Sequence, residues 1–141
     1  LLCDQMHGCI TRHSILVEFT EPDAFMPCYP VVSMQDHLTH MGSRQNLLGA
    51  DWDNVLYVNM FSNELNITKT TPPCFIWITR NDNAVDAKNV LVLADALYAK
   101  GVYFELHIYP DGCHGKGLAE DTNDICTWPG HAVTFLKNLG W

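Results

Sequence analysis

The sequence predicts an α/β fold in which a parallel sheet of about three strands is flanked by helices. The first observation is the run 74–79, which is continuously apolar, β-branched and aromatic, as in strands that are buried on both faces. The second is the order strand, helix, strand, helix over residues 74–139, with short connections. That order implies a right-handed crossover and parallel strands. The 141 residues suit a single domain, 1–141.

The N-terminal half of the chain gives weaker signals. Residues 15–19 are a short apolar run that fits either a strand or a helix. Residues 23–29 predict a further strand, and Pro27 within it lacks the N–H that an internal strand needs, which favours a place at the sheet edge. Residues 33–66 are polar and predict a loop-and-helix excursion, with one short turn at 47–49.

The C-terminal half predicts an element in each segment. Residues 87–100 carry apolar side chains at helical spacing, and Gly101 follows them as a stop signal. Residues 103–109 alternate between apolar and polar side chains, which indicates a strand. Residues 128–139 place their apolar side chains on one stripe of a closing helix, and Gly140 caps it.

Composition and charge exclude several classes of partner. The chain has 8 Lys+Arg against 16 Asp+Glu, a net charge of −8, which argues against binding to nucleic acid or to anionic membranes. No stretch approaches about 18 consecutive apolar residues, so we expect no transmembrane helix. No signal peptide is visible in this chain. We expect a soluble protein, and the sequence leaves its compartment open.

Cysteine and histidine are frequent, but their spacing is not that of a metal or redox motif. The six cysteines lie at positions 3, 9, 28, 74, 113 and 126. No Cys-x-x-Cys pair occurs, so we expect mostly free thiols, with Cys113 and Cys126 as the best candidate for a disulfide. His37 and His40 lie three residues apart, and no third ligand has a convincing position. We therefore expect no metal and no cofactor.

Two loops carry the candidate catalytic side chains, Asp82 and His114. Residues 79–85 follow the first C-terminal strand, and residues 111–117 follow the second. Parallel strands lie about 4.8 Å apart, and the loops that leave their carboxyl ends share one edge of the sheet. Asp82 and His114 should therefore be close in space. A carboxylate that accepts a hydrogen bond from imidazole Nδ1 fixes the tautomer of a general base, although such pairs on loops are also common without function.

Several ordered blocks along the chain resemble a known family. They are YPVVSM at 29–34, SRQNLLG at 43–49, TPPCFIW at 71–77, FELHIYP at 104–110, GCHGKGLA at 112–119 and FLKNLGW at 135–141. Together they resemble the C-terminal half of an α/β-hydrolase and are most similar to the small acetyl-xylan-esterase-like carboxylesterases. Relatives of that family include the prolyl-oligopeptidase-type hydrolases. The resemblance covers about residues 23–141.

The resemblance implies roles for individual residues. The acid of the family's catalytic triad lies in a Thr-x-x-Asp-x-x-Val pattern, which falls on Asp82, with Thr79 and Val85 as positioning residues. The base lies in a Gly-x-His-Gly loop, which falls on His114. His114 would deprotonate a serine and later protonate the leaving alcohol, and Asp82 would orient the imidazole.

The nucleophile of the family has no counterpart in the sequence. The family places a serine in a Gly-x-Ser-x-Gly elbow, and neither this motif nor the oxyanion-hole glycine motif occurs here. The serines at positions 14, 33, 43 and 62 lack the flanking glycines. Cys3 aligns loosely with the nucleophile position, again without elbow glycines. A hydrolase of this kind needs roughly 250 residues, so the chain alone is expected to be inactive.

Two functional hypotheses follow. The first is the C-terminal part of a serine-type carboxylesterase that hydrolyses short-chain (acetyl) esters, with a small ester or an acetylated sugar as substrate and the nucleophile elbow missing. The alternative is a non-catalytic α/β remnant that acts as a binding or assembly module. Such a remnant would expose a sheet edge through which a homo-oligomer forms.

Overall fold

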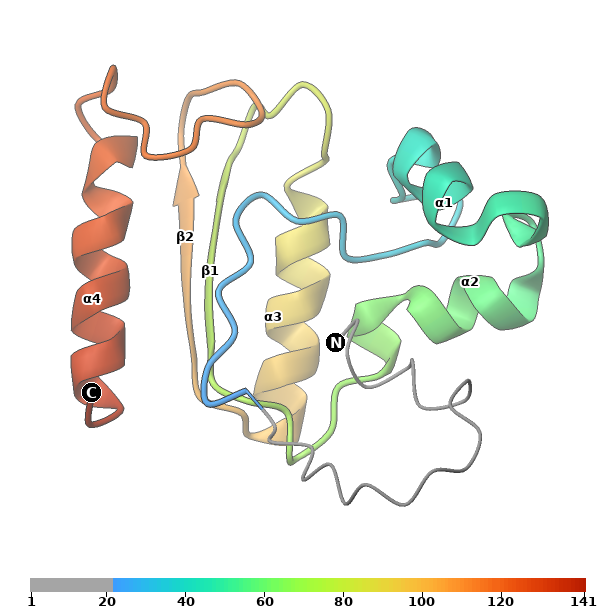
Figure 1. Cartoon of the computed structure of the whole chain (residues 1–141), viewed down its shortest axis with the longest axis horizontal. Coiled ribbons are helices and arrows are strands. Elements are labelled where there is room, and N and C mark those ends of the chain that lie inside the picture. Colours follow the sequence, from blue (N-terminus) through green and yellow to red (C-terminus); the bar gives the residue numbers. More distant parts are fainter. Residues whose placement is uncertain (1–21) are drawn as a thin grey trace, which may run out of the picture.

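The computed structural model describes residues 22–141, and its centre is a two-stranded parallel sheet (Figure 1). The strands are β1 (Cys74–Thr79) and β2 (Phe104–Tyr109), paired from Cys74 with Phe104 to Thr79 with Tyr109. Helix α3 (Lys88–Lys100) connects them and covers one face, while α4 (Trp128–Asn138) covers the other. The predicted α/β class and the order of its C-terminal elements are confirmed.

Burial of β1 on both faces explains its unbroken apolar sequence. All of its residues are buried, and successive side chains point to opposite faces of the sheet. The core on the α3 side contains Cys74, Ile76, Ile78, Val90, Leu93 and Leu97. The core on the α4 side contains Phe75, Trp77, Tyr109, Ala132 and Phe135. The prediction of a strand buried on both faces is therefore correct.

The third strand predicted at 23–29 is not regular. The segment lies beside β1 on the edge opposite β2 and forms only two isolated parallel bridges, Phe25 with Cys74 and Cys28 with Trp77. In a regular parallel ladder the residue at position 27 would donate to the carbonyl of Phe75, and Pro27 has no N–H. The sheet thus has two strands and an irregular third position. Pairing of two chains through this edge stays a prediction.

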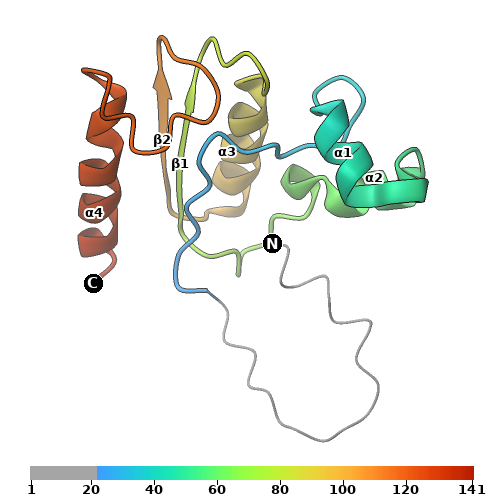
Figure 2. The same ribbon diagram turned by 45° about the horizontal axis from the view of Figure 1, so that its top comes forward.

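Residues 33–66 contain more helix than the single turn expected at 47–49. Figure 2 shows α1 (Met41–Leu48) and α2 (Val55–Phe61) set to the side of the sheet beyond α3. His40 caps α1 by accepting a hydrogen bond from the N–H of Ser43, 3.3 Å. Asn54 caps α2 by accepting from the N–H of Leu56, 3.1 Å. The predicted loop-and-helix excursion is therefore present, but it holds more helix than the one short turn expected at 47–49, because local caps, rather than an apolar stripe, define these helices.

The described residues settle some of the remaining expectations. Cys28, Cys74, Cys113 and Cys126 are free thiols, so the candidate disulfide between Cys113 and Cys126 is not formed. Within residues 22–141 no helix is long and apolar enough to cross a bilayer. The apolar run 15–19 and the candidate nucleophile Cys3 lie outside the described residues.

A fully buried amide, Asn89 on α3, ties this helix to the segment that leads to α1. Its Oδ1 accepts hydrogen bonds from the N–H groups of Val32 (2.9 Å) and Ser33 (3.0 Å). Its Nδ2 donates to the carbonyls of Leu38 and Asp86, both at 3.1 Å. Both donor hydrogens and both acceptor lone pairs of the amide are used, so no other side chain of this size could make the same four hydrogen bonds.

Replacing Asn89 with Asp should lower the free energy of unfolding by about 1–3 kcal/mol. The carboxylate keeps the two acceptor contacts but cannot donate to the buried Leu38 carbonyl, which loses this partner. The exposed Asp86 carbonyl still accepts from the backbone N–H of residue 89, 2.9 Å. Urea unfolding at neutral pH measures the change. Asn46→Asp, on the exposed surface of α1, is the control and should change stability by less than about 0.5 kcal/mol. Equal losses in both variants would contradict this role of Asn89.

Candidate active site

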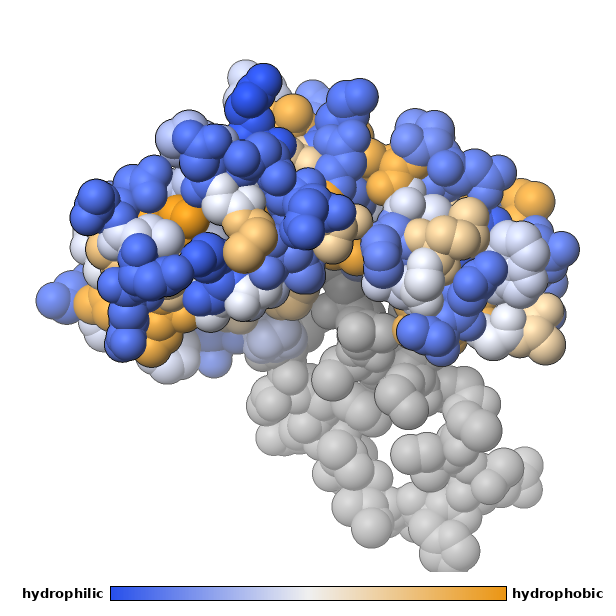
Figure 3. Space-filling model, turned by 90° about the horizontal axis from the view of Figure 1, so that it is seen from above, coloured by the Kyte–Doolittle hydropathy of each residue, from blue (hydrophilic) through white to orange (hydrophobic). Residues whose placement is uncertain are grey.

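The loops that follow β1 and β2 meet at the carboxyl edge of the sheet and bring Asp82 and His114 together. His114 Nδ1 lies 2.8 Å from Asp82 Oδ2, although 32 residues separate the two in sequence. A carboxylate only accepts hydrogen bonds, so Nδ1 carries the proton, and Nε2 of the neutral ring is left as the basic nitrogen. The predicted juxtaposition is confirmed. Seen from above, this end of the molecule is largely hydrophilic (Figure 3).

Asp82 is held as an ionised carboxylate. Its side chain is only 1% exposed. Burial alone would raise the pKa, but the N–H groups of Val85 (2.9 Å) and Ala84 (2.8 Å) donate to Oδ1, and His114 donates to Oδ2. Together these contacts outweigh the burial and lower the pKa of the Asp82 carboxyl. The carboxylate therefore stays charged at neutral pH and holds the imidazole in one orientation.

Three side chains, one at the end of β1 and two in the loop that follows it, fasten the His114 loop in place. Thr79 Oγ1 donates to the carbonyl of Gly112, 2.9 Å, and Asn81 Oδ1 accepts from the Gly112 N–H, 2.8 Å. Asn83 Oδ1 accepts from the N–H of His114, 3.2 Å. The sequence pointed to Thr79 through the family resemblance, whereas Asn81 and Asn83 were missed. In the sequence, only their positions on either side of Asp82 could have indicated that Asn81 and Asn83 belong to the site.

Gly112 permits the close approach of these two loops. A Cβ at this position would lie 2.7 Å from Thr79 Cγ2 and 2.8 Å from Ile125 Cδ1, and the backbone φ is +158°. Both neighbours are packed in place, because Thr79 and Ile125 are buried. No side chain fits here without moving the loop that carries His114.

Gly112→Ala should therefore destabilise the protein by about 1–3 kcal/mol. Thermal unfolding measures this loss, and the NMR signal of the His114 ring should shift as its loop moves. Gly130→Ala is the matched control, because Gly130 is exposed within α4 and a Cβ there would meet nothing within 4 Å. That control should be neutral or stabilising by up to about 1 kcal/mol. A Gly112→Ala variant as stable as the wild type would mean that the backbone at residue 112 does not pack tightly against Thr79 and Ile125.

Tyr29 is a further residue of the site that the sequence did not reveal. Its ring meets the ring of His114 edge-on, with centroids 4.9 Å apart, and meets Trp77 in the same way at 5.0 Å. The backbone of Tyr29 has a positive φ of 41°. The aromatic ring thus supports one side of the imidazole, while the His114 side chain remains 36% exposed. Among the described residues, no group hydrogen-bonds His114 Nε2.

The described serines are not placed as nucleophiles for His114. Ser33 Oγ donates to Glu64 Oε1 at 2.6 Å, and Ser62 Oγ donates to the Val58 carbonyl at 2.7 Å. Both are buried away from solvent. Ser43 lies beside His40, with 3.0 Å between its Oγ and Nδ1 of that ring. Within residues 22–141, the candidate site therefore consists of the hydrogen-bonded Asp82–His114 pair, and the hydroxyls of Ser33 and Ser62 are engaged elsewhere.

His37 and His40, three residues apart in the sequence, belong to different local elements. His40 caps α1 and His37 lies in the preceding turn, so the two do not share a helical face. A different group of ligand-type side chains is present among the described residues, comprising Glu105, His107 and His131. It lies between β2 and α4 and was not predicted.

The parallel strand–helix–strand core with an Asp–His pair at its carboxyl edge defines a protein of the α/β-hydrolase class. The family model of the prolyl oligopeptidase family matches residues 17–140, and the chain belongs to that family. The expected resemblance is thereby confirmed.

Individual relatives are esterases and xylan-degrading enzymes. Endo-1,4-beta-xylanase B of Butyrivibrio fibrisolvens is 39% identical over 101 residues, which are 71% of this chain and 15% of that protein. Acetylxylan esterase of Xylanibacter ruminicola is 29% identical over 115 residues, 79% of this chain and 22% of the esterase. The chain thus spans less than a quarter of the length of these curated relatives.

Solved structures extend the comparison to the fold. The acetyl ester-xyloside bifunctional hydrolase from Caldicellulosiruptor lactoaceticus is 41% identical, with a TM-score of 0.79 over 84% of this chain and 43% of the hydrolase. A carboxylesterase from Lactobacillus plantarum shares the fold at 22% identity and a TM-score of 0.69. The chain is therefore related to acetyl esterases and carboxylesterases, and it matches somewhat under half of their structures.

Proposed function

We propose that this chain supplies the Asp82–His114 part of the catalytic triad of a serine-type carboxylesterase that hydrolyses short-chain (acetyl) esters. The observation that carries the proposal is the hydrogen bond of 2.8 Å between His114 Nδ1 and Asp82 Oδ2 at the carboxyl edge of the sheet. Membership of the prolyl oligopeptidase family supports it. The proposed substrate class is acetylated sugars, which follows from the acetylxylan and acetyl ester-xyloside hydrolases among the relatives.

The proposed reaction proceeds through an acyl-enzyme. His114 Nε2 accepts the proton of a serine hydroxyl as the serine oxygen bonds to the acetyl carbon. The imidazolium then gives this proton to the alkoxide of the sugar as the ester C–O bond breaks. In the second half, Nε2 takes a proton from water as the water oxygen bonds to the acetyl carbon of the acetyl-serine. The imidazolium returns this proton to the serine oxygen as the bond between that oxygen and the acetyl carbon breaks, and acetic acid leaves. The ionised Asp82 stabilises the imidazolium in both steps.

The serine itself must come from residues outside this sequence, because no Gly-x-Ser-x-Gly motif occurs in it. We propose that a longer form of the protein or a second chain provides the nucleophile elbow and the oxyanion-binding N–H groups. Without them, the Asp–His pair lacks an atom on which an acyl group can be held. The chain alone is then expected to have no esterase activity above the level of free imidazole.

A chimera tests the proposal directly. In it, this chain replaces the matching part of the acetyl ester-xyloside hydrolase from Caldicellulosiruptor lactoaceticus, which retains its own remaining residues. The chimera should react with a serine-directed fluorophosphonate and hydrolyse acetylated xylose, and His114→Gln should abolish both. His37→Gln, at an exposed position in a turn, is the matched control. A folded chimera without adduct and without activity would favour the non-catalytic alternative, an α/β module that binds or assembles.

A further inference from the structure

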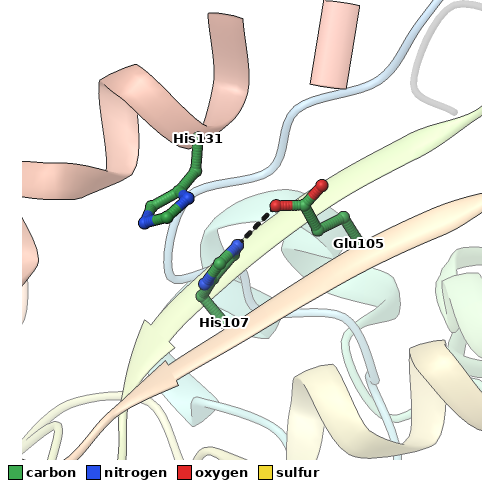
Figure 4. A group of neighbouring side chains, drawn as sticks. All are labelled: Glu105, His107 and His131. Atoms are coloured by element: carbon green, nitrogen blue, oxygen red, sulfur yellow. Dashed lines mark hydrogen bonds and ion pairs between the residues drawn. The ribbon is translucent and has the colours of Figure 1, made fainter. Parts of the chain in front are cut away.

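A group of three side chains with metal-binding atoms lies between β2 and α4, away from the Asp82–His114 pair. It comprises Glu105, His107 and His131, and their ligand atoms all lie within 4.8 Å of one another. His107 Nε2 is 2.6 Å from Glu105 Oε1. The ring of His131 lies above that of His107, with centroids 4.6 Å apart (Figure 4). Nothing in the proposed esterase chemistry uses these three residues.

Regular secondary structure positions all three side chains, two on a strand and one on a helix. Glu105 and His107 are two positions apart on β2, so both point to the sheet face that α4 covers. His131 projects toward them from the first half of α4 (Figure 4). The ring of His107 is held by Phe75, with ring centroids 5.4 Å apart, and by Tyr109 at 6.0 Å. The site is therefore built on a strand and a helix rather than on loops.

We propose that Glu105, His107 and His131 bind a zinc ion. Two imidazoles and one carboxylate are a ligand set that zinc adopts when a water occupies its fourth position. Around a tetrahedral zinc with bonds of about 2.0–2.1 Å, neighbouring ligand atoms lie about 3.3 Å apart, so small side-chain rotations suffice to reach this geometry. An alkali or magnesium ion would prefer oxygen ligands, and only one of the three residues offers oxygen.

Access and charge favour a cation at this position. The side chains of His107 and Glu105 are 24% and 32% exposed, and His131 is exposed. An ion from solvent reaches them without opening the core. The chain as a whole carries a net charge of −8, which attracts cations. No lysine or arginine of the described residues is paired with Glu105.

A bound zinc would join the two elements that frame the His114 loop. β2 ends at Tyr109, immediately before this loop, and α4 begins at Trp128, after it. A metal bridge from β2 to α4 would close residues 110–127 into a loop with both ends fixed. The expected consequence is a more rigid segment around His114, without any direct contact between the metal and that residue.

Calorimetric titration of the purified, tag-free protein with ZnCl₂ tests the proposal. The thiols are alkylated beforehand, because free cysteines also bind zinc. We expect one zinc ion per chain, and at least about tenfold weaker binding in His131→Gln and in Glu105→Gln, since even outer-shell residues of zinc sites are worth about 10–100-fold. The exposed His131 can be replaced without disturbing the core. His37→Gln is the control and should bind as the wild type does.

Cobalt(II) provides a second readout that does not depend on affinity. Co²⁺ in place of zinc should give the intense visible absorption of a four-coordinate ion, and His131→Gln should abolish it. A folded wild-type protein that binds no zinc, or one in which the His131→Gln and His37→Gln variants bind equally, would overturn the proposal. In that case Glu105 and His107 form a surface ion pair only.

Discussion

Replacement of Asp82 by Asn should lower kcat for ester hydrolysis about 10⁴-fold, with little change in KM. Asn keeps the size of the side chain, and its Oδ1 still accepts from the N–H groups of Ala84 and Val85. Its NH₂ group, however, faces His114 Nδ1, and two donors cannot bond to each other. The imidazole then turns to the tautomer with the proton on Nε2 and can no longer accept a proton from serine. Loss of the acid in known Ser-His-Asp triads has an effect of this size.

The experiment uses the active form of the enzyme, such as the chimera described above, and acetylated xylose as substrate. Asp95→Asn is the matched control, because Asp95 is exposed on α3 and should leave kcat within about twofold. A change in KM alone would mean that Asp82 serves substrate binding rather than orientation of the base. Equal activity of the two variants would remove Asp82 from the proposed triad.

The same carboxylate should make stability depend on pH in the acidic range. Because the folded protein lowers the pKa of Asp82, the folded state holds the ionised form more favourably than the unfolded chain does, whose Asp pKa is about 3.9. This stabilisation is fully present above the unfolded pKa and is lost as the pH falls through the folded value. The difference in urea midpoint between wild type and Asp82→Asn should therefore shrink as the pH falls below about 4. If the difference in urea midpoint between the two proteins stayed constant as the pH falls below about 4, Asp82 would not be the source of the pH dependence.

The second large effect is expected on stability, from Trp77→Ala. Trp77 lies in β1, is 1% exposed, and packs face to face with Trp128 at a ring-centroid distance of 5.5 Å. It also meets the edges of Tyr29 and Tyr109. Removing a buried side chain of this size costs about 3–5 kcal/mol, because it loses the transfer free energy and leaves a cavity. That is a large part of the 5–15 kcal/mol that stabilises a typical domain.

Denaturant unfolding followed by circular dichroism measures this loss. Trp141→Ala is the matched control, since Trp141 is 68% exposed and its removal should cost less than about 0.5 kcal/mol. Trp77→Ala should also alter the environment of His114, because the Trp77 ring contacts Tyr29 and the Tyr29 ring contacts the imidazole. A Trp77→Ala protein as stable as Trp141→Ala would mean that the α4 side of the core does not stabilise the fold.

The elements that the sequence predicts well are those that bury apolar side chains. β1 is buried throughout, and α3 buries Val90, Leu93 and Leu97, so their patterns are direct consequences of packing. Helix α1 buries only Arg44, which pairs with Asp36 and donates from Nε to the carbonyl of Trp52, 2.6 Å. A helix whose only buried residue is an arginine has no apolar period to detect.

In the candidate site, too, some residues could be predicted from the sequence and others could not. Asp82 and His114 could be placed together because parallel strands end at one edge, a rule that depends only on the order of the elements. Tyr29 comes from the irregular segment beside β1, where Pro27 breaks the ladder, and no spacing in the sequence connects it with His114. The Glu105–His107–His131 group likewise depends on how α4 packs across β2. Such contacts require the three-dimensional arrangement itself.

The fastening of the His114 loop by Thr79, Asn81 and Asn83 bears on how a complete enzyme would be assembled. Asp82 and His114 are already aligned within this chain, so in the proposed triad the arrival of a nucleophile would require no rearrangement of the pair. Association with a separate chain that supplies the proposed nucleophile would then be a docking of two formed surfaces, in which the main cost is the loss of translational and rotational freedom. Joining the two parts in one polypeptide removes most of that cost, which gives a covalent connection a catalytic value of its own.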